Sequence, residues 1–240
     1  MAPLPVRTAN NVKAALERVS SPEKAKASAW FFKTKAGEYG AGDQFIGVTV
    51  PEQRKIAKQF KQLALPEISN LLQSPIHEHR LTGLFILAGQ YQAGDEGAKR
   101  EVVDCYVKNL DCINNWDLVD SSASYIYGDW LKTRSKTRLP SLAKSKNVWH
   151  RRIAMISCGA FIRDGDFAEA LKIAKILVHD SHDLIQKAVG WMLREIGNRD
   201  RSTELAFLDQ YAATMPRTML RYAIEKFPAP LRTHYLAVPR

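Results

Sequence analysis

The sequence is poor in cysteine and has no long apolar run. Cys105, Cys112 and Cys158 are odd in number and lack C-x-x-C spacing, which argues against a disulfide framework and a structural zinc site. We expect them to be buried apolar fillers. No run approaches the roughly 18 apolar residues that cross a bilayer, and the first residues do not resemble a secretory signal. We therefore expect a cytoplasmic protein that does not span a membrane.

Several catalytic and ligand-binding motifs are also missing. There is no G-x-x-x-x-G-K-[ST] phosphate loop and no G-x-S-x-G elbow. The histidines of "HEHR" and "HDSHD" could suggest a metal site, but the second group falls where a hairpin turn is expected, where such residues cap helices. "RDGDF" around Gly165 lacks most ligands of a calcium loop and indicates a tight turn. We predict no metal and no cofactor.

Positive charge is in excess. The 240 residues contain 35 Lys and Arg against 25 Asp and Glu, which gives a formal charge of +10. This excess favours a polyanionic partner such as nucleic acid or, less often, an acidic membrane surface. The apolar fraction of 45% is that of an ordinary soluble globular protein, and the length allows one large domain or two small ones.

Helical periodicity runs along most of the chain, with almost no alternating strand pattern. The stretch "DFAEALKIAKILVHDSHDLIQKAVGWMLREIGN" predicts two amphipathic helices joined by a turn at "HDSHD", the second ended by Gly197. Similar second helices recur in "EHRLTGLFIL", "NNWDLVDSSA", "HRRIAMISCG", "LIQKAVGWML" and "TMLRYAIEKF". Aligning Arg80, Trp116, Arg152, Lys187 and Arg221 gives intervals of 36, 36, 35 and 34 residues.

This period is typical of stacked helical pairs. A tetratricopeptide repeat has a similar length, but its W-x2-L-G-x2-Y signature is absent, so we favour a HEAT-like repeat. The prediction is an all-α superhelical solenoid of antiparallel helix pairs with a basic concave groove. It forms one domain over 1–240, with an N-terminal helix or arm at 1–19 and a C-terminal tail at 229–240.

Basic side chains recur at one position of the repeat. We predict that they bind a polyanion in the groove, although a solvated helix surface is the alternative for any one of them. The residues at this position are Arg80, Arg152, Lys187 and Arg221, and the basic neighbours that extend the set are Arg151, Arg194 and Arg217.

The N-terminal third has aromatic residues and a glycine-rich loop. Ser21 and Pro22 predict the cap and first residue of a helix, and another helix is expected to begin at Pro51. Trp30, Phe31 and Phe32 cannot all face inward on one helix, so at least one of them should be exposed.

Trp116 and Asp120 lie four residues apart, so they share one helix face, whereas Asp117 points about 100 degrees away and suits an early-helix position. A carboxylate in a basic groove needs a cation. The candidates are a cationic modified base and the oxocarbenium-like sugar formed when a glycosidic bond breaks, and tryptophan faces favour the same species. Trp191 is a second candidate, although it could be a core residue, as we expect for Trp130 and Trp149.

Five segments together resemble the AlkD-type DNA alkylation repair glycosylases: "QFIGVTVPEQRKIAK", "NNWDLVD", "VWHRRIAM", "IQKAVGWMLRE" and "PRTMLRYAIEKF". The resemblance covers roughly residues 20 to 228. It implies HEAT-like repeats and excision of positively charged N3- and N7-alkylated purines from double-stranded DNA, leaving an abasic site, without metal, cofactor or base flipping.

The resemblance also implies site residues. By position, Asp120 would stabilise the sugar cation and hold the water, Trp116 and Trp191 would pack on the sugar, and Arg152 would bind a phosphate. Phe31 stands where the family pattern has a tyrosine, and Trp30, Phe31 or Tyr39 would contact DNA. We expect a monomer, and because its partner would be DNA, we expect it to be associated with the nucleoid. The alternatives are a DNA-binding protein without excision activity, recognising damaged or branched DNA, and a scaffold for acidic proteins.

Overall fold

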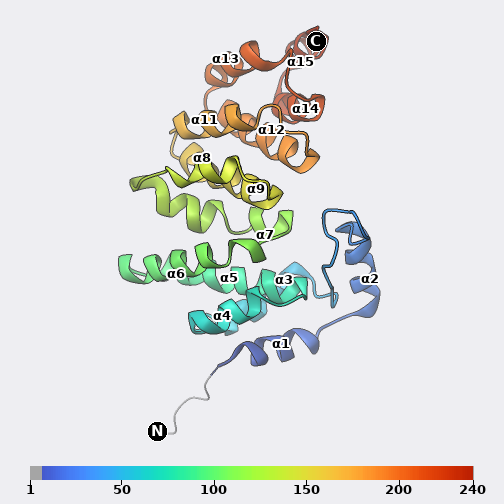
Figure 1. Ribbon diagram of the computed structural model, residues 1–240, viewed down its shortest axis with the longest axis vertical. Helices are drawn as coiled ribbons and strands as arrows, with labels where there is room; N and C mark the ends of the chain where they lie inside the picture. Colours follow the sequence, from blue (N-terminus) through green and yellow to red (C-terminus); the bar gives the residue numbers. More distant parts are fainter. Residues whose placement is uncertain (1–6, 240) are drawn as a thin grey trace. The chain divides into compact units, whose positions relative to one another are not determined.

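The computed structural model describes residues 7–239, and its regular elements are helices (Figure 1). Within these residues the β-type pairing is a single isolated bridge between Gln44 and Ile76. The all-α prediction is therefore confirmed. The chain divides into two compact units, with the boundary between Ser122 and Ala123. The superhelical stacking, the groove and the single domain over 1–240 stay predictions.

The first unit is built around α5, His77–Ala93, which packs against α1, α3, α4, α6 and α7. Because neighbours surround it, α5 is buried on nearly every side and has no strongly polar face. The unit comprises α1 (Ala9–Glu17), α2 (Pro22–Phe31), α3 (Val50–Gln59), α4 (Leu65–Leu72), α5, α6 (Glu96–Lys108), the 3₁₀ turn Leu110–Cys112 and α7 (Trp116–Asp120).

The second unit has α12, Asp183–Gly197, at its centre, in contact with α9, α10, α11, α13 and α14. Its elements are a π-helical turn (Ser124–Gly128), a 3₁₀ turn (Leu131–Thr133), α8 (Arg138–Ala143), α9 (Val148–Ser157), α10 (Gly159–Arg163), α11 (Ala168–Leu177), α12, α13 (Arg201–Tyr211), α14 (Arg217–Ala223), a 3₁₀ turn (Ile224–Lys226) and α15 (Ala229–Ala237).

Helical periodicity located most elements. The predicted hairpin is α11 and α12, and the five aligned positions of the repeat all lie in helices: α5, α7, α9, α12 and α14. Ser21 caps α2 and Pro22 is its first residue, as predicted. Gly165 takes a positive φ of 79°, in keeping with a tight turn. Cys158 is buried as expected, whereas Cys105 and Cys112 are only half-buried.

The ends of the described chain are packed helices. In α1 the side chains of Val12 and Leu16 are fully buried, which fits the predicted N-terminal helix, while residues 1–6 lie outside the described part. Residues 229–237, within the predicted C-terminal tail, form α15. Its Tyr235 is buried and donates a hydrogen bond of 2.6 Å to Asp209 of α13.

Candidate functional site

The site begins with the short helix α7. Asn115 caps it: its side-chain oxygen accepts the backbone N–H of Trp116 at 2.8 Å. Trp116 and Asp120 are the first and last residues of the helix, and both are half-buried. The two residues therefore share one face of one helical turn, as the spacing predicts. A helix of five residues cannot sustain itself in water, so its surroundings must hold it.

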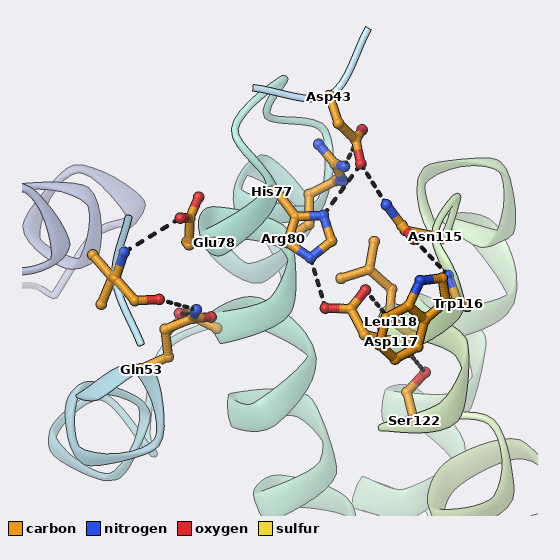
Figure 2. A network of polar contacts seen from close by, with 12 residues as sticks. Asp43, Gln53, His77, Glu78, Arg80, Asn115, Trp116, Asp117, Leu118 and Ser122 are labelled. Carbon is orange, nitrogen blue, oxygen red and sulfur yellow. Dashed lines mark hydrogen bonds and ion pairs between the residues drawn. The ribbon is translucent and has the colours of Figure 1, made fainter. Parts of the chain in front are cut away.

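A histidine of α5 holds the first turn of α7. Nε2 of His77 lies 2.8 Å from an Asp117 carboxylate oxygen, and Nδ1 lies 3.2 Å from Oδ2 of Asp43 in the loop that follows α2 (Figure 2). Burial by itself lowers the pKa of His77, but the hydrogen bonds to Asp117 and Asp43 raise it to about 9. His77 is therefore an imidazolium at neutral pH.

Asp43 connects α5 and α7 directly as well. Its carboxylate accepts hydrogen bonds from Arg80 at 2.6 Å and from the Asn115 side chain at 2.9 Å. Burial raises the pKa of Asp43. The hydrogen bonds from His77 and Asn115 and the charge of Arg80 lower this pKa by more than burial raises it, so the net shift is downward. Two carboxylates thus face two cations in the first unit, which is how buried charges are kept.

The sequence "HEHR" at the start of α5 is buried, and each of its side chains has an internal partner. Glu78 accepts the backbone N–H groups of residues 46, 47 and 48 at 3.1, 2.7 and 3.3 Å. His79 lies 2.9 Å from the Ser74 hydroxyl, and burial lowers its pKa to about 4, so it is neutral. Figure 2 places Gln53 beside the same loop, where its side chain donates a hydrogen bond of 2.8 Å to the carbonyl of Val48.

Aromatic rings continue the network toward Trp116. Phe32 stacks on Trp116 with centroids 5.2 Å apart and lies 5.0 Å from the His77 ring. The Tyr39 hydroxyl accepts the Trp116 indole N–H at 3.3 Å and lies 3.4 Å from the Phe31 carbonyl. Trp30 is 79% exposed and Phe31 56%, so the prediction of exposed aromatics at the end of α2 is confirmed.

The structure departs from the expectation of a solvent-facing basic row. Arg80 is 3% exposed and Arg152 5%. Arg80 pairs with Asp43 and donates a hydrogen bond of 2.8 Å to the Ser74 carbonyl. Arg152 donates a hydrogen bond of 2.5 Å to the Leu184 carbonyl. Burial forces these guanidinium groups to find acceptors inside the protein.

Most of the other cations of the set also have partners in their own unit. Arg151 pairs with Asp180 at 2.7 Å and Lys187 with Asp183 at 2.7 Å. Arg194 pairs with Glu225, Arg217 donates to the Leu236 carbonyl at 2.7 Å, and Arg221 is exposed. Their contact with DNA stays a prediction, and any phosphate has to compete with these carboxylates.

Tryptophans of the second unit differ in burial. Trp191 is half-buried in α12, Trp149 is 7% exposed at the start of α9, as expected for a core residue, and Trp130 is half-buried with the Arg134 guanidinium 3.4 Å from its ring centroid. His182 belongs to the "HDSHD" segment, for which the sequence favoured helix capping over a metal site. It caps α12 by accepting the Leu184 N–H at 3.2 Å. Within residues 7–239 no group of three or more His, Cys, Asp or Glu side chains is arranged to hold a metal ion.

Sequence reasoning missed the residues that support α7. It assigned Asp117 to an early-helix position and did not connect it with His77, 40 residues earlier. The available signal was a run of four polar residues directly before the apolar stretch of α5, because such residues need partners if the helix is buried.

Solved structures with the same fold are found at low sequence identity. A predicted DNA alkylation repair enzyme from Enterococcus faecalis matches with a TM-score of 0.68 and 18% identity, covering 88% of this chain and 97% of that one. AlkD2 from Streptococcus mutans matches with a TM-score of 0.53 and 17% identity, covering 92% and 97%. A comparison with curated proteins gives no significant match. Among the helices of residues 7–239, none has the length and apolar character of a membrane span.

A family model matches most of the chain as well. The model described as "DNA alkylation repair enzyme" matches residues 12–227, which includes α1 to α14 almost completely. The matched range contains the helix pairs of both units and the whole network around α7. This chain therefore belongs to the DNA alkylation repair enzyme family.

Proposed function

We propose that the protein is a DNA glycosylase that hydrolyses the N-glycosidic bond of positively charged N3- and N7-alkylated purines in duplex DNA and leaves an abasic site. The observation that carries the proposal is the pair Trp116 and Asp120 on one face of α7, in a chain of this family. Both side chains are half-buried, so the surrounding protein restrains them while solvent and ligands can still reach them.

The chemistry requires one carboxylate and one water. A cationic purine is a good leaving group without protonation, so no paired general acid is needed, and the sugar becomes oxocarbenium-like as the bond breaks. A carboxylate about 4 Å from that cation attracts it by roughly 4 kcal/mol at an effective dielectric near 20. If this attraction develops only in the transition state, it is worth about a thousandfold in rate. In this proposal Asp120 supplies it and orients the attacking water.

The tryptophan next to the carboxylate suits the same transition state. An indole face attracts a cation through its quadrupole. The Trp116 indole is held on one face by Phe32 and at its N–H by Tyr39, so the ring is oriented before DNA arrives. We assign Trp116 to packing against the sugar of the damaged nucleotide.

For the second unit the roles follow the resemblance. We propose that Trp191 packs on the DNA sugar and that Arg152 binds a phosphate, which requires its buried guanidinium to turn away from the Leu184 carbonyl. Excision would proceed without base flipping, so selectivity would rest on the charge and lability of the lesion. Trp30 and Phe31, exposed at the end of α2, would contact the DNA directly.

The test is release of alkylated base from methylated duplex DNA. The wild type should release 7-methylguanine and 3-methyladenine, and Asp120→Asn should be slower by about a thousandfold. Asp104→Asn is the matched control, because Asp104 is an exposed acid on α6 of the same unit. Equal release by wild type and Asp120→Asn contradicts the proposed role of the carboxylate.

Two other outcomes identify the alternatives. Salt-sensitive binding of duplex DNA without base release would favour a DNA-binding protein without excision activity. Failure to bind duplex DNA at all, in a protein that is folded by circular dichroism, would favour a scaffold for acidic proteins. Both outcomes contradict the glycosylase proposal.

A further inference from the structure

His77 makes contacts that its burial alone does not require. Both ring nitrogens meet carboxylate oxygens, at 2.8 Å on Asp117 and 3.2 Å on Asp43, and the residue is 2% exposed. Ionised carboxylates only accept hydrogen bonds, so both nitrogens must donate, and the ring is an imidazolium. A neutral histidine could satisfy only one of the two acids. The ring therefore joins two segments that are separated in sequence, the loop after α2 and the start of α7.

The contact with Asp117 reaches the helix that carries the proposed chemistry. One oxygen of Asp117 accepts from His77, and the other accepts the backbone N–H of Leu118 at 2.8 Å (Figure 2). Asp117 thus fixes the direction of the first turn of α7. Trp116 precedes it directly, and Asp120 lies three residues further on the same short helix.

Ring contacts give a second connection between His77 and Trp116. Phe32 lies between them, with centroids 5.2 Å from Trp116 and 5.0 Å from His77. Phe45 stacks on both Phe32 and His77, at 5.1 and 4.7 Å. A rotation of the imidazole would therefore move the ring against which the Trp116 indole rests, as well as the carboxylate beside it.

We propose that His77 is a positioning residue for the reacting face of α7: its two hydrogen bonds set the orientation of Trp116 and Asp120 toward the DNA sugar. This inference rests on the proposed glycosylase activity, and His77 itself touches no substrate. Misplacement of a reacting group by about 1 Å can cost roughly a hundredfold in rate. His77 thus controls the rate of the chemical step more than the affinity for DNA.

Two isosteric substitutions separate the contacts of His77. In His77→Gln the side-chain amide nitrogen falls near the position of Nε2 and can still donate to Asp117. In His77→Asn it falls near Nδ1 and can still donate to Asp43. Because the Asp117 contact fixes the turn of α7, His77→Asn should impair positioning more than His77→Gln. His179→Asn, an exposed histidine between α11 and α12, is the control.

The experiment has two readouts on the full chain. The first compares the single-turnover rate of 7-methylguanine release with the dissociation constant for duplex DNA. His77→Asn should lower the rate roughly 10- to 100-fold and change the dissociation constant less than about threefold, with a smaller rate loss in His77→Gln. A loss of rate matched by an equal loss of DNA affinity, or equal losses in the two variants, would overturn the proposal.

The second readout does not depend on activity. In protein labelled with 5-fluorotryptophan, the ¹⁹F resonance of Trp116, assigned by its disappearance in Trp116→Phe, should shift in His77→Asn and stay in place in His179→Asn. If the wild type releases no base but the resonance shifts, the glycosylase proposal fails while the positioning of Trp116 holds. An unchanged resonance in a folded His77→Asn protein overturns the positioning.

Titration of the wild type keeps the test valid if the variants do not fold. The charged groups that face His77 are Asp43 from the loop, Asp117 from α7 and Arg80 from its own helix. Loss of the His77 proton should shift the Trp116 resonance with a midpoint near pH 9. A resonance that stays constant from pH 7 to about 10 would contradict the proposal.

Discussion

The stability of the protein should fall with rising pH because of His77. Its pKa is 6.5 in the unfolded chain and about 9 in the folded protein. A folded pKa above the unfolded one means that the folded state binds the proton more tightly, so the contribution to stability is complete below pH 6.5 and is lost as the pH rises through 9. A gap of about 2.5 pH units at 1.36 kcal/mol each corresponds to about 3 kcal/mol.

Urea unfolding followed by circular dichroism at several values between pH 6 and 10 measures this loss. The free energy of unfolding of the wild type should decrease by about 3 kcal/mol more than that of His77→Gln over this range. The comparison with His77→Gln is necessary because a second group titrates in the same pH range. A parallel decline in the two proteins would refute the reasoning, since the difference between them reports the His77 proton alone.

That second group is Glu204, buried in α13 at 1% exposure. Burial raises its pKa to about 8 from an ordinary value of 4.5, so the folded protein holds a neutral carboxyl. Stability from this group is present below pH 4.5 and is lost as the pH rises through 8. Glu204→Gln should remove this part of the decline and leave the part due to His77, and a decline unchanged by Glu204→Gln would contradict the assignment.

Five further substitutions test the packing, a helix cap and the exposed surface. Gly190→Ala should lower the free energy of unfolding by about 1–3 kcal/mol, because the new methyl group would lie 2.4 Å from a carbonyl of α14. Gly89→Ala on α5 should raise the free energy of unfolding by up to about 1 kcal/mol, because its methyl group would enter open space. Equal melting temperatures of the two variants would contradict both expectations. Asn147→Ala should cost about 1 kcal/mol in urea unfolding, because it removes the acceptor for a first-turn N–H of α9, and a cost near zero would show that the cap is dispensable. Trp30→Ala and Phe31→Ala should weaken duplex DNA binding about tenfold in fluorescence anisotropy with little change in melting temperature, and unchanged binding would exclude these rings from the DNA contact.

Sequence patterns predicted the elements better than the contacts between them. The helical period, the Ser21 cap and the hairpin of α11 and α12 depend on nearest neighbours in the chain, so they could be read directly. The pairing of His77 with Asp43 and Asp117 joins residues 34 and 40 positions apart, and no local pattern encodes such a distance.

The basic side chains show the same limit. Arg80 occupies the repeat position that the alignment indicates, but spacing alone cannot distinguish a cation that faces solvent from one that neutralises a buried acid. Arg80 is of the second kind, because Asp43, in the loop that packs on α5, is the buried acid that it neutralises. For Trp116 and Asp120 the spacing was sufficient, since four residues on one helix determine a shared face without any tertiary information.

The anchoring of the loop after α2 has a consequence for how chains of this kind can vary in length. Glu78 holds residues 46–48 and the charged cluster holds Asp43, while Phe32 is fixed on the other side by its stacked rings. Between these attachment points, Ala36 and Gly37 are exposed, and a side chain at Gly37 would meet nothing within 4 Å. Extra residues inserted there would bulge into water and leave both ends attached, which makes this turn a suitable place to graft a tag or a reporter peptide.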